Sequence, residues 1–228
     1  MSVGIVLAAG GRGLRMGGAL PKQFIAIDGT PIYLHALRPF LEHPEVLAIR
    51  VGMPEDYTDE VGRALMELYP GELFSGRLSV FPGGRRRQDT VEKGVRLMGQ
   101  IPGISGVLVH DAARPFLSHE ILDRTIRMLE RGQAVGVGVP VSDTLWRVSG
   151  EEKKIEVREI VPREAIVAAQ TPQGAPLPLF LSALDRAKVE DREFTDEASL
   201  FLWAGLPFVL VEGSNRNRKI TRPEDLLL

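Results

Sequence analysis

The chain has 228 residues, a length that suits a sizeable hydrophobic core, so we expect residues 1–228 to form one domain. Apolar residues make up 44% and charged residues 25%, and the formal net charge is −2, so we expect neither nucleic acid nor a membrane as a partner. Cysteine is absent, which excludes disulfides, thiolate catalysis and cysteine-based zinc sites and is compatible with a cytoplasmic location.

The first half of the chain predicts buried strands that alternate with helices. Residues 3–7 form a continuous apolar run that ends in a glycine-rich loop, which is typical of a buried strand. Pro31 predicts the start of a helix over 32–41, because proline is tolerated in the first helical turn. The same periodicity predicts strands at 46–51, 78–81 and 106–110 and helices at 56–68 and 89–98.

The second half continues the alternation. Ser118 is a favourable cap for a helix over 118–131. We also predict strands at 134–139 and 208–211 and helices at 177–188, 195–204 and 223–228. Strand–helix alternation of this kind indicates an α/β fold with a mostly parallel sheet and helices on both faces. Ligands of such sheets bind beyond the carboxyl ends of the strands, so the functional candidates are the residues that follow the strands.

Residues 141–161 interrupt this pattern. Apolar and polar side chains alternate over 144–148 and again over 155–157, and residues 149–152 provide a turn. The pattern predicts a β-hairpin arm. Because an isolated hairpin is marginal in water, we expect the arm to pack against a symmetric partner subunit. The alternative is an antiparallel edge of the main sheet.

A glycine-dense and basic loop, residues 8–17, follows the first strand. Its glycines allow successive backbone N–H groups to form an anion-binding nest, and Arg15 and Lys22 add positive charge for phosphate oxygens. We therefore predict a site for nucleotide phosphates, the alternative being a turn that only reverses the chain. A dinucleotide fingerprint is excluded because Met16 stands where its third glycine is required, and a Walker A loop is excluded because this loop has no Gly-Lys pair.

The turn after the third predicted strand contains Gly83 and Gly84, followed by three arginines at 85–87. The glycines permit the close approach of a base or a ribose. Thr90 lies near the start of a helix, where its hydroxyl can bond a ligand or cap the helix. We expect at least two of the three arginines to form a solvated basic turn.

Asp111 follows the fourth predicted strand. A buried carboxylate is costly unless it is paired or bound to a metal, so Asp111 is a candidate for contact with ribose, substrate or Mg²⁺. The alternative is a salt bridge with Arg114 that holds the loop. We expect the neighbouring His110 to be structural. The cations of residues 215–222 could close over a phosphate or form a solvated loop.

Six ordered motifs resemble the 2-C-methyl-D-erythritol 4-phosphate cytidylyltransferase family, and they lie at residues 8–23, 109–115, 143–144, 170–173, 195–199 and 219–225. The resemblance implies a Rossmann-like nucleotidyltransferase fold, a homodimer held by the β-arm and Mg²⁺ as the usual metal. It also implies the reaction of CTP with 2-C-methyl-D-erythritol 4-phosphate in the non-mevalonate route to isoprenoid precursors. The products are 4-CDP-2-C-methyl-D-erythritol and pyrophosphate.

The resemblance further implies roles for individual residues. Arg15 and Lys22 match the pair that stabilises charge in the glycine loop, and Arg163 and Lys219 match the cations that hold the acceptor phosphate. The nucleotide-binding positions correspond to Ala8, Ala9, Gly10, Gly11, Gly84, Thr90 and Ala112. The acceptor-binding positions correspond to Asp111, Arg114, Thr144 and Thr195. Thr144 and Arg163, on or beside the arm, are expected to reach the partner subunit's site. The sequence departs from the family at Arg85, where an acidic residue is common.

The expected mechanism is direct in-line attack on the α-phosphorus of CTP. Without cysteine or an evident Ser-His pair, a covalent intermediate is not favoured. The acceptor phosphate is itself a nucleophile at neutral pH, so the enzyme has to supply alignment and charge stabilisation. Two alternatives stay open: a cytidylyltransferase for ribitol 5-phosphate or another polyol phosphate, and a non-catalytic nucleotide-binding regulator. A NAD-dependent oxidoreductase is disfavoured by the missing glycine.

Overall fold

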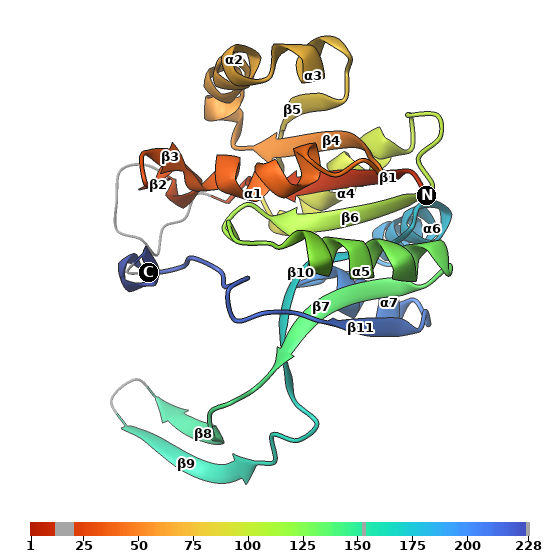
Figure 1. Ribbon diagram of the computed structural model, residues 1–228. Helices are drawn as coiled ribbons and strands as arrows, with labels where there is room; N and C mark the ends of the chain where they lie inside the picture. The colour runs from red at the N-terminus through yellow and green to blue at the C-terminus, as the bar shows by residue number, and fades with distance from the viewer. Residues whose placement is uncertain (12–20, 152–153, 227–228) are drawn as a thin grey trace.

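The computed structural model describes residues 1–11, 21–151 and 154–226. Its centre is a seven-stranded sheet (Figure 1). The strands are β1 (Val3–Ala8), β4 (Val46–Met53), β5 (Leu78–Pro82), β6 (Gly106–Asp111), β7 (Ala134–Pro140), β10 (Val167–Pro176) and β11 (Phe208–Glu212). Their order is β11-β7-β10-β6-β1-β4-β5, and neighbours run parallel except at β10. The prediction of a mostly parallel sheet is therefore confirmed.

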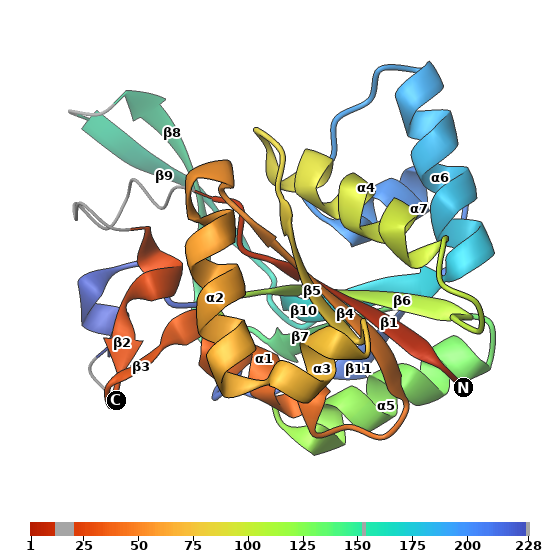
Figure 2. The same ribbon diagram turned by 90° about the horizontal axis from the view of Figure 1, so that it is seen from above.

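Helices cover both faces of this sheet. They are α1 (Ile32–Leu41), α2 (Thr58–Leu68), α3 (Pro70–Phe74), α4 (Arg87–Met98), α5 (His119–Glu130), α6 (Leu177–Val189) and α7 (Glu197–Trp203). Figure 2 shows α1, α2 and α5 on one side of the sheet and α4, α6 and α7 on the other. Within the described residues, no helix has both the length and the apolar character needed to cross a membrane.

Side-chain alternation along β1 explains why its sequence is apolar throughout. Ile5 and Leu7 pack with α1 and α5 in one core cluster, whereas Val6 packs with α4 and α6 in a second cluster on the opposite face. All three side chains are fully buried. Burial of such a side chain contributes about 1.5–3 kcal/mol, so β1 anchors both layers and fixes the position of the loop that follows it.

The predicted helices and strands agree with the structure except at a few places. The helix expected from residue 56 begins as the 3-10 turn η3 (Glu55–Tyr57), and α3 was not predicted. The final segment forms the 3-10 turn η4 (Pro223–Leu226) instead of a regular helix, and residues 227–228 lie outside the described part. A 3-10 turn η2 (Lys22–Phe24) and a small antiparallel pair, β2 (Ala26–Ile27) and β3 (Thr30–Pro31), follow the glycine loop.

The central antiparallel strand β10 was also not predicted. It inserts between β6 and β7 and pairs with both, with a register shift between Gln170 and Gln173. Its sequence lacks the apolar run of the other strands, because glycine, glutamine and two prolines occupy much of it. Gly174 is required by packing: a Cβ atom there would lie 1.9 Å from the carbonyl oxygen of Val107 on β6.

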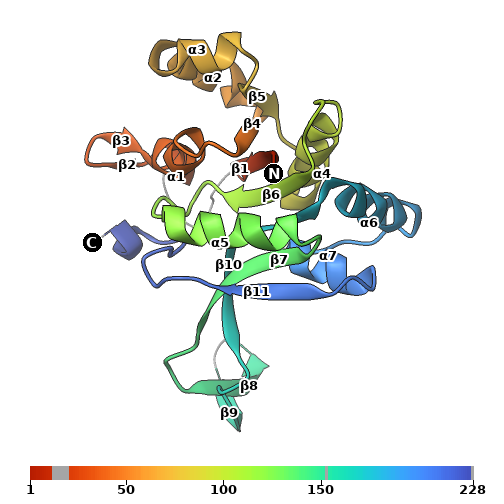
Figure 3. The ribbon, with the colours of Figure 1, turned by 45° about the vertical axis from the view of Figure 1, so that its right-hand side comes forward.

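Residues 141–161 contain the hairpin strands β8 (Leu145–Glu151) and β9 (Lys154–Val161). They form a separate two-stranded sheet and not an edge of the main sheet, which was the alternative. Figure 3 shows that the chain enters the hairpin from β7 and returns through β10. The predicted turn at 149–152 is misplaced, because Ser149 and Gly150 belong to β8, and residues 152–153 lie outside the described part.

Candidate active site

A cavity opens at the carboxyl ends of β1, β5 and β6, where the sheet topology places ligands. Its lining residues come from the loops after these strands and from two further segments: Ala8, Ala9, Gly10, Gly11, Lys22, Gln23, Arg85, Arg86, Arg87, Thr90, Asp111, Ala112, Ala113 and Lys219. Five of these side chains are cationic and one is a carboxylate. The described part of the cavity therefore favours a polyanionic ligand.

Gln23 binds the start of the loop after β1. The Gln23 amide donates to the carbonyl oxygens of Ala9, at 2.6 Å, and Gly11, at 3.1 Å, and only 2% of the side chain is exposed. The adjacent Lys22 also lines the cavity, and its Nζ lies 3.4 Å from the carbonyl oxygen of Ile220. Two chain segments that are 198 residues apart thus meet at this wall. The predicted phosphate ligand Arg15 lies outside the described residues.

The glycine turn after β5 packs on Thr90 of α4. The Gly84 N–H donates to Thr90 Oγ1 at 2.9 Å, and Thr90 is 1% exposed. A Cβ atom at Gly10 would lie 2.7 Å from the same oxygen, so the two predicted nucleotide loops touch through glycine and threonine. Thr90 lines the cavity, whereas Gly84 is not among its lining residues.

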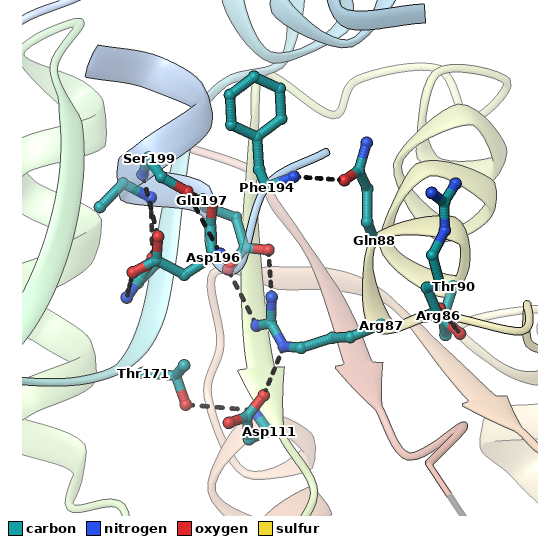
Figure 4. Close-up of polar contacts among 12 residues, drawn as sticks. Arg86, Arg87, Gln88, Thr90, Asp111, Thr171, Phe194, Asp196, Glu197 and Ser199 are labelled. Atoms are coloured by element: carbon teal, nitrogen blue, oxygen red, sulfur yellow. Dashed lines mark hydrogen bonds and ion pairs between the residues drawn. The ribbon is translucent and has the colours of Figure 1, made fainter. Parts of the chain in front are cut away.

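Of the three arginines after this turn, Arg85 and Arg86 are exposed, as expected. Arg86 pairs with Asp89 and Glu193. Arg87 is half-buried and extends toward the centre of the site (Figure 4).

Asp111, at the end of β6, lies between two cations. Its Oδ1 accepts from Arg87 Nε at 2.9 Å, and its Oδ2 accepts from Lys219 Nζ at 2.6 Å. The two terminal nitrogens of Arg87 donate to the two oxygens of Glu197 at 2.7 and 3.0 Å. The result is a chain of alternating charge, from Glu197 through Arg87 and Asp111 to Lys219, part of which is drawn in Figure 4.

The two carboxylates of this chain have opposite pKa shifts. Burial alone would raise the pKa of Asp111, but the charges and hydrogen bonds of Arg87 and Lys219 outweigh it and hold the pKa well below its usual range. Burial raises the pKa of Glu197, which is 3% exposed, and its single cationic partner Arg87 only partly opposes this. Asp111 is therefore a fixed negative charge beside the cavity.

His110 is buried and structural, as expected. Its Nε2 lies 3.0 Å from the carbonyl oxygen of Arg114, and its Nδ1 lies 2.9 Å from Thr171 Oγ1. The same Thr171 oxygen accepts from the backbone N–H of Asp111 at 3.1 Å. Burial lowers the pKa of His110 to about 4. A neutral imidazole therefore holds the end of β6, which carries Asp111, against β10.

One interpretation of Asp111 needs correction. The alternative of a salt bridge with Arg114 is wrong: the buried Arg114 guanidinium donates to the carbonyl oxygens of Asn217 and Ala169, and only its backbone N–H bonds the Asp111 carbonyl. Direct ligation of Mg²⁺ by Asp111 stays a prediction, and in this structure its two carboxylate oxygens pair with Arg87 and Lys219. The described residues contain no group of three metal-ligating side chains. Acceptor binding by Arg114 stays a prediction.

The remaining predicted acceptor residues do not line the cavity of their own chain. Thr144 is exposed in the loop before β8, and Arg163, also exposed, bonds the carbonyl oxygen of Ser142 at the base of the hairpin. Thr195 is exposed just before α7. Their contact with a substrate stays a prediction, which for Thr144 and Arg163 requires a second subunit.

Sequence reasoning missed three residues that shape the site. Gln23 directly follows Lys22, and an amide beside a glycine loop was a signal that could have been used. The sequence leaves open which of the three arginines is not solvated, because nothing in a run of arginines distinguishes the half-buried Arg87 from its exposed neighbours. Glu197 is far from Asp111 in the sequence, so only the fold brings both to Arg87.

Known proteins resemble this chain over its whole length. The family model described as IspD, 2-C-methyl-D-erythritol 4-phosphate cytidylyltransferase, matches residues 3–228. The bifunctional enzyme IspD/IspF of Desulfotalea psychrophila is 40% identical over 98% of this chain and 55% of its own length. The 2-C-methyl-D-erythritol 4-phosphate cytidylyltransferase of Solibacter usitatus is 36% identical over 100% of this chain and 94% of its own length.

The structural comparison agrees. The crystal structure of 2-C-methyl-D-erythritol 4-phosphate cytidylyltransferase from Thermus thermophilus superposes with a TM-score of 0.79 at 30% identity, covering 100% of this chain and 96% of that one. The chain spans about half the length of the bifunctional relatives that it matches. Sequence and structure together lead to one conclusion: this chain belongs to the 2-C-methyl-D-erythritol 4-phosphate cytidylyltransferase family.

Proposed function

We propose that this protein transfers CMP from CTP to 2-C-methyl-D-erythritol 4-phosphate and releases pyrophosphate. The observation that carries the proposal is the cationic cavity at the carboxyl ends of β1, β5 and β6, in a chain of this family. Lys22 and Lys219 come from distant parts of the sequence and both line this cavity. A triphosphate and an acceptor phosphate meeting there would require such cations to offset their repulsion.

The proposed chemical step is a direct displacement. An oxygen of the acceptor phosphate forms a bond to the α-phosphorus of CTP, and the bond from that phosphorus to the bridging oxygen of the β-phosphate breaks. Pyrophosphate leaves with the electron pair, so no general base is required. The Thr171–His110 pair is not a nucleophile and base for this reaction, because both side chains are buried and neither lines the cavity. Lys22 and Lys219 stabilise the charge that builds on the phosphates.

We further propose that Mg²⁺ enters with CTP, held mainly by phosphate oxygens. The two carboxylate oxygens of Asp111 accept hydrogen bonds from Arg87 and Lys219. Mg²⁺ commonly keeps water and phosphate ligands at sites where the protein provides few carboxylates. A cytoplasmic location stays a prediction from the sequence.

The proposed assembly is a homodimer in which the hairpin meets the partner subunit. Trp146 pairs with Ile160 and Val148 pairs with Val157 across β8 and β9, and these four apolar side chains are 50–67% exposed in the single chain. An apolar surface of this kind favours burial against another chain. Light scattering at micromolar concentration is the test, and a monomer would contradict the proposal.

The catalytic proposal is tested by pyrophosphate release from CTP and Mg²⁺ with two acceptors in parallel. Release with methylerythritol 4-phosphate and not with ribitol 5-phosphate is the expected result. Release only with ribitol 5-phosphate would change the assigned acceptor to ribitol 5-phosphate. Release with neither acceptor would favour a nucleotide-binding protein without this activity. A Lys22→Ala variant purified in the same way is the control for contaminating activity. Its pyrophosphate release should fall if the protein itself is the enzyme, whereas release by a contaminating enzyme would be unchanged.

A further inference from the structure

Glu197 is a buried carboxylate that lies outside the cavity. It occupies the first turn of α7, is 3% exposed, and is not among the lining residues. A buried charge of this kind is costly unless it is fully paired, and here the partner is Arg87, which does line the cavity. Glu197 therefore contacts a residue that lines the cavity but does not line the cavity itself.

The geometry of this pair decides how Arg87 meets Asp111. Glu197 accepts from both terminal nitrogens of the guanidinium, at 2.7 and 3.0 Å. Only Nε of Arg87 then remains directed toward Asp111, and it donates to one oxygen, Oδ1, at 2.9 Å. The guanidinium is thereby held with its fork turned away from Asp111.

This orientation leaves the second oxygen of Asp111 for Lys219, whose Nζ lies 2.6 Å from Oδ2. Arginine prefers to bind a carboxylate through two parallel N–H bonds. Without Glu197, the fork of Arg87 would be free to turn and engage both Asp111 oxygens. Lys219, which is 38% exposed on the cavity wall, would then lose its anchor.

The start of α4 holds the backbone around this network. Gln88 accepts the Phe194 N–H at 2.7 Å and donates to the Arg192 carbonyl oxygen at 3.1 Å, while Arg86 pairs with Glu193. Residues on both sides of Arg87 thus bind the segment before α7. Arg87 and Glu197 are held at a fixed separation by contacts other than their own.

We propose that Glu197 is a positioning residue that fixes Lys219 through Arg87 and Asp111, and so sets the affinity for the acceptor phosphate. This inference rests on the proposed function, because it assigns Lys219 to the acceptor. Glu197 itself touches no substrate. Its removal should therefore act on acceptor binding and turnover without changing the binding of CTP.

The test is the Glu197→Gln variant, assayed by steady-state pyrophosphate release with each substrate varied in turn. Glutamine keeps the shape but directs an N–H₂ group at a guanidinium nitrogen, which releases one arm of the fork. We expect kcat/KM for the acceptor to fall on the order of 10- to 100-fold, since small misplacements of a binding group cost about this much. KM for CTP should stay within about twofold, and Glu197→Asp should restore part of the loss.

Asp196→Asn is the matched control. It removes the same charge one residue away. There Oδ1 caps α7 by accepting the Ser199 N–H, a role that asparagine fills equally well, and only the long contact of Oδ2 with Gln173 Nε2, at 3.4 Å, is lost. Its kinetics should equal those of the wild type. Glu197→Gln added to Asp111→Asn should cause little further loss, because both changes interrupt one chain. Additive losses, a matching rise in KM for CTP, or wild-type kinetics would overturn the proposal.

A crystal structure of the Glu197→Gln variant gives a readout that does not depend on turnover. We expect the Asp111 carboxylate to rotate and its contact with Lys219 to be lost, and an unchanged contact would overturn the inference. If Glu197→Gln does not fold, Arg87→Lys takes its place, because one ammonium cannot hold both carboxylates as the fork does. An inactive wild type would refute the proposed function, and the crystallographic result would still decide the positioning role.

Discussion

Lowering the pH should destabilise the protein through His110. Its Nε2 lies within hydrogen-bond distance of a carbonyl oxygen, that of Arg114, so Nε2 must carry the proton and Nδ1 must accept from the Thr171 hydroxyl. Protonation of Nδ1 removes that acceptor and places a charge in a fully buried site. Because the native pKa is lowered, the contribution of His110 is present above the unfolded pKa of about 6.5 and is lost as the pH falls to about 4.

The magnitude follows from the two pKa values. A native value of about 4 in place of 6.5 corresponds to about 3 kcal/mol of unfolding free energy. The assay is urea unfolding across this pH range for the wild type and for His110→Asn, at one protein concentration because any dimer would add a concentration dependence. The carboxylates are common to both proteins, so their contributions cancel in the difference. Parallel pH profiles for the two proteins would refute the reasoning.

Three further predictions concern activity. Lys22→Ala should lower kcat about 10²- to 10³-fold and weaken CTP binding less, as single-turnover kinetics with calorimetry would show, and near-normal turnover would exclude its role. Mixed dimers of Lys22→Ala and Arg163→Ala subunits should regain one active site in two, whereas no recovery would indicate a site built from a single chain. Gln23→Met removes one buried and one partly buried hydrogen bond to the start of the loop after β1, so KM for CTP should rise about 10-fold or more; an unchanged KM would mean that this part of the loop keeps its shape without the amide.

Much of the fold could be predicted because local pattern and tertiary structure agree there. The helix over 32–41 was placed to the residue, since Pro31 starts it and its apolar positions repeat on one face. The strand β1 was recognisable because burial on both faces demands an apolar side chain at nearly every position. β10 had no such signal. It is a strand because β6 and β7 supply its hydrogen-bond partners, not because its own residues favour the conformation.

Some features of the candidate site could likewise be predicted from the sequence, and others could not. Glycines after strands, a lysine beside them and an aspartate at the end of β6 were visible as motifs, because ligand chemistry constrains residues that are close in sequence. The partners of Asp111 were not visible. Arg114, in the same loop, was the natural candidate from sequence, but the actual partners are Arg87 and Lys219, from two distant segments.

By itself, the sequence determined the alternation of strands and helices, the loops predicted to bind phosphate and the resemblance to a family. Each of these depends on short-range periodicity or on a contiguous motif. Only the tertiary structure decided which charges meet, which of three arginines is the least exposed, and which oxygen of Asp111 is left for Lys219. The physical reason is that ion pairing depends on distance and direction in space, and those are set by how β6, α4 and α7 pack together.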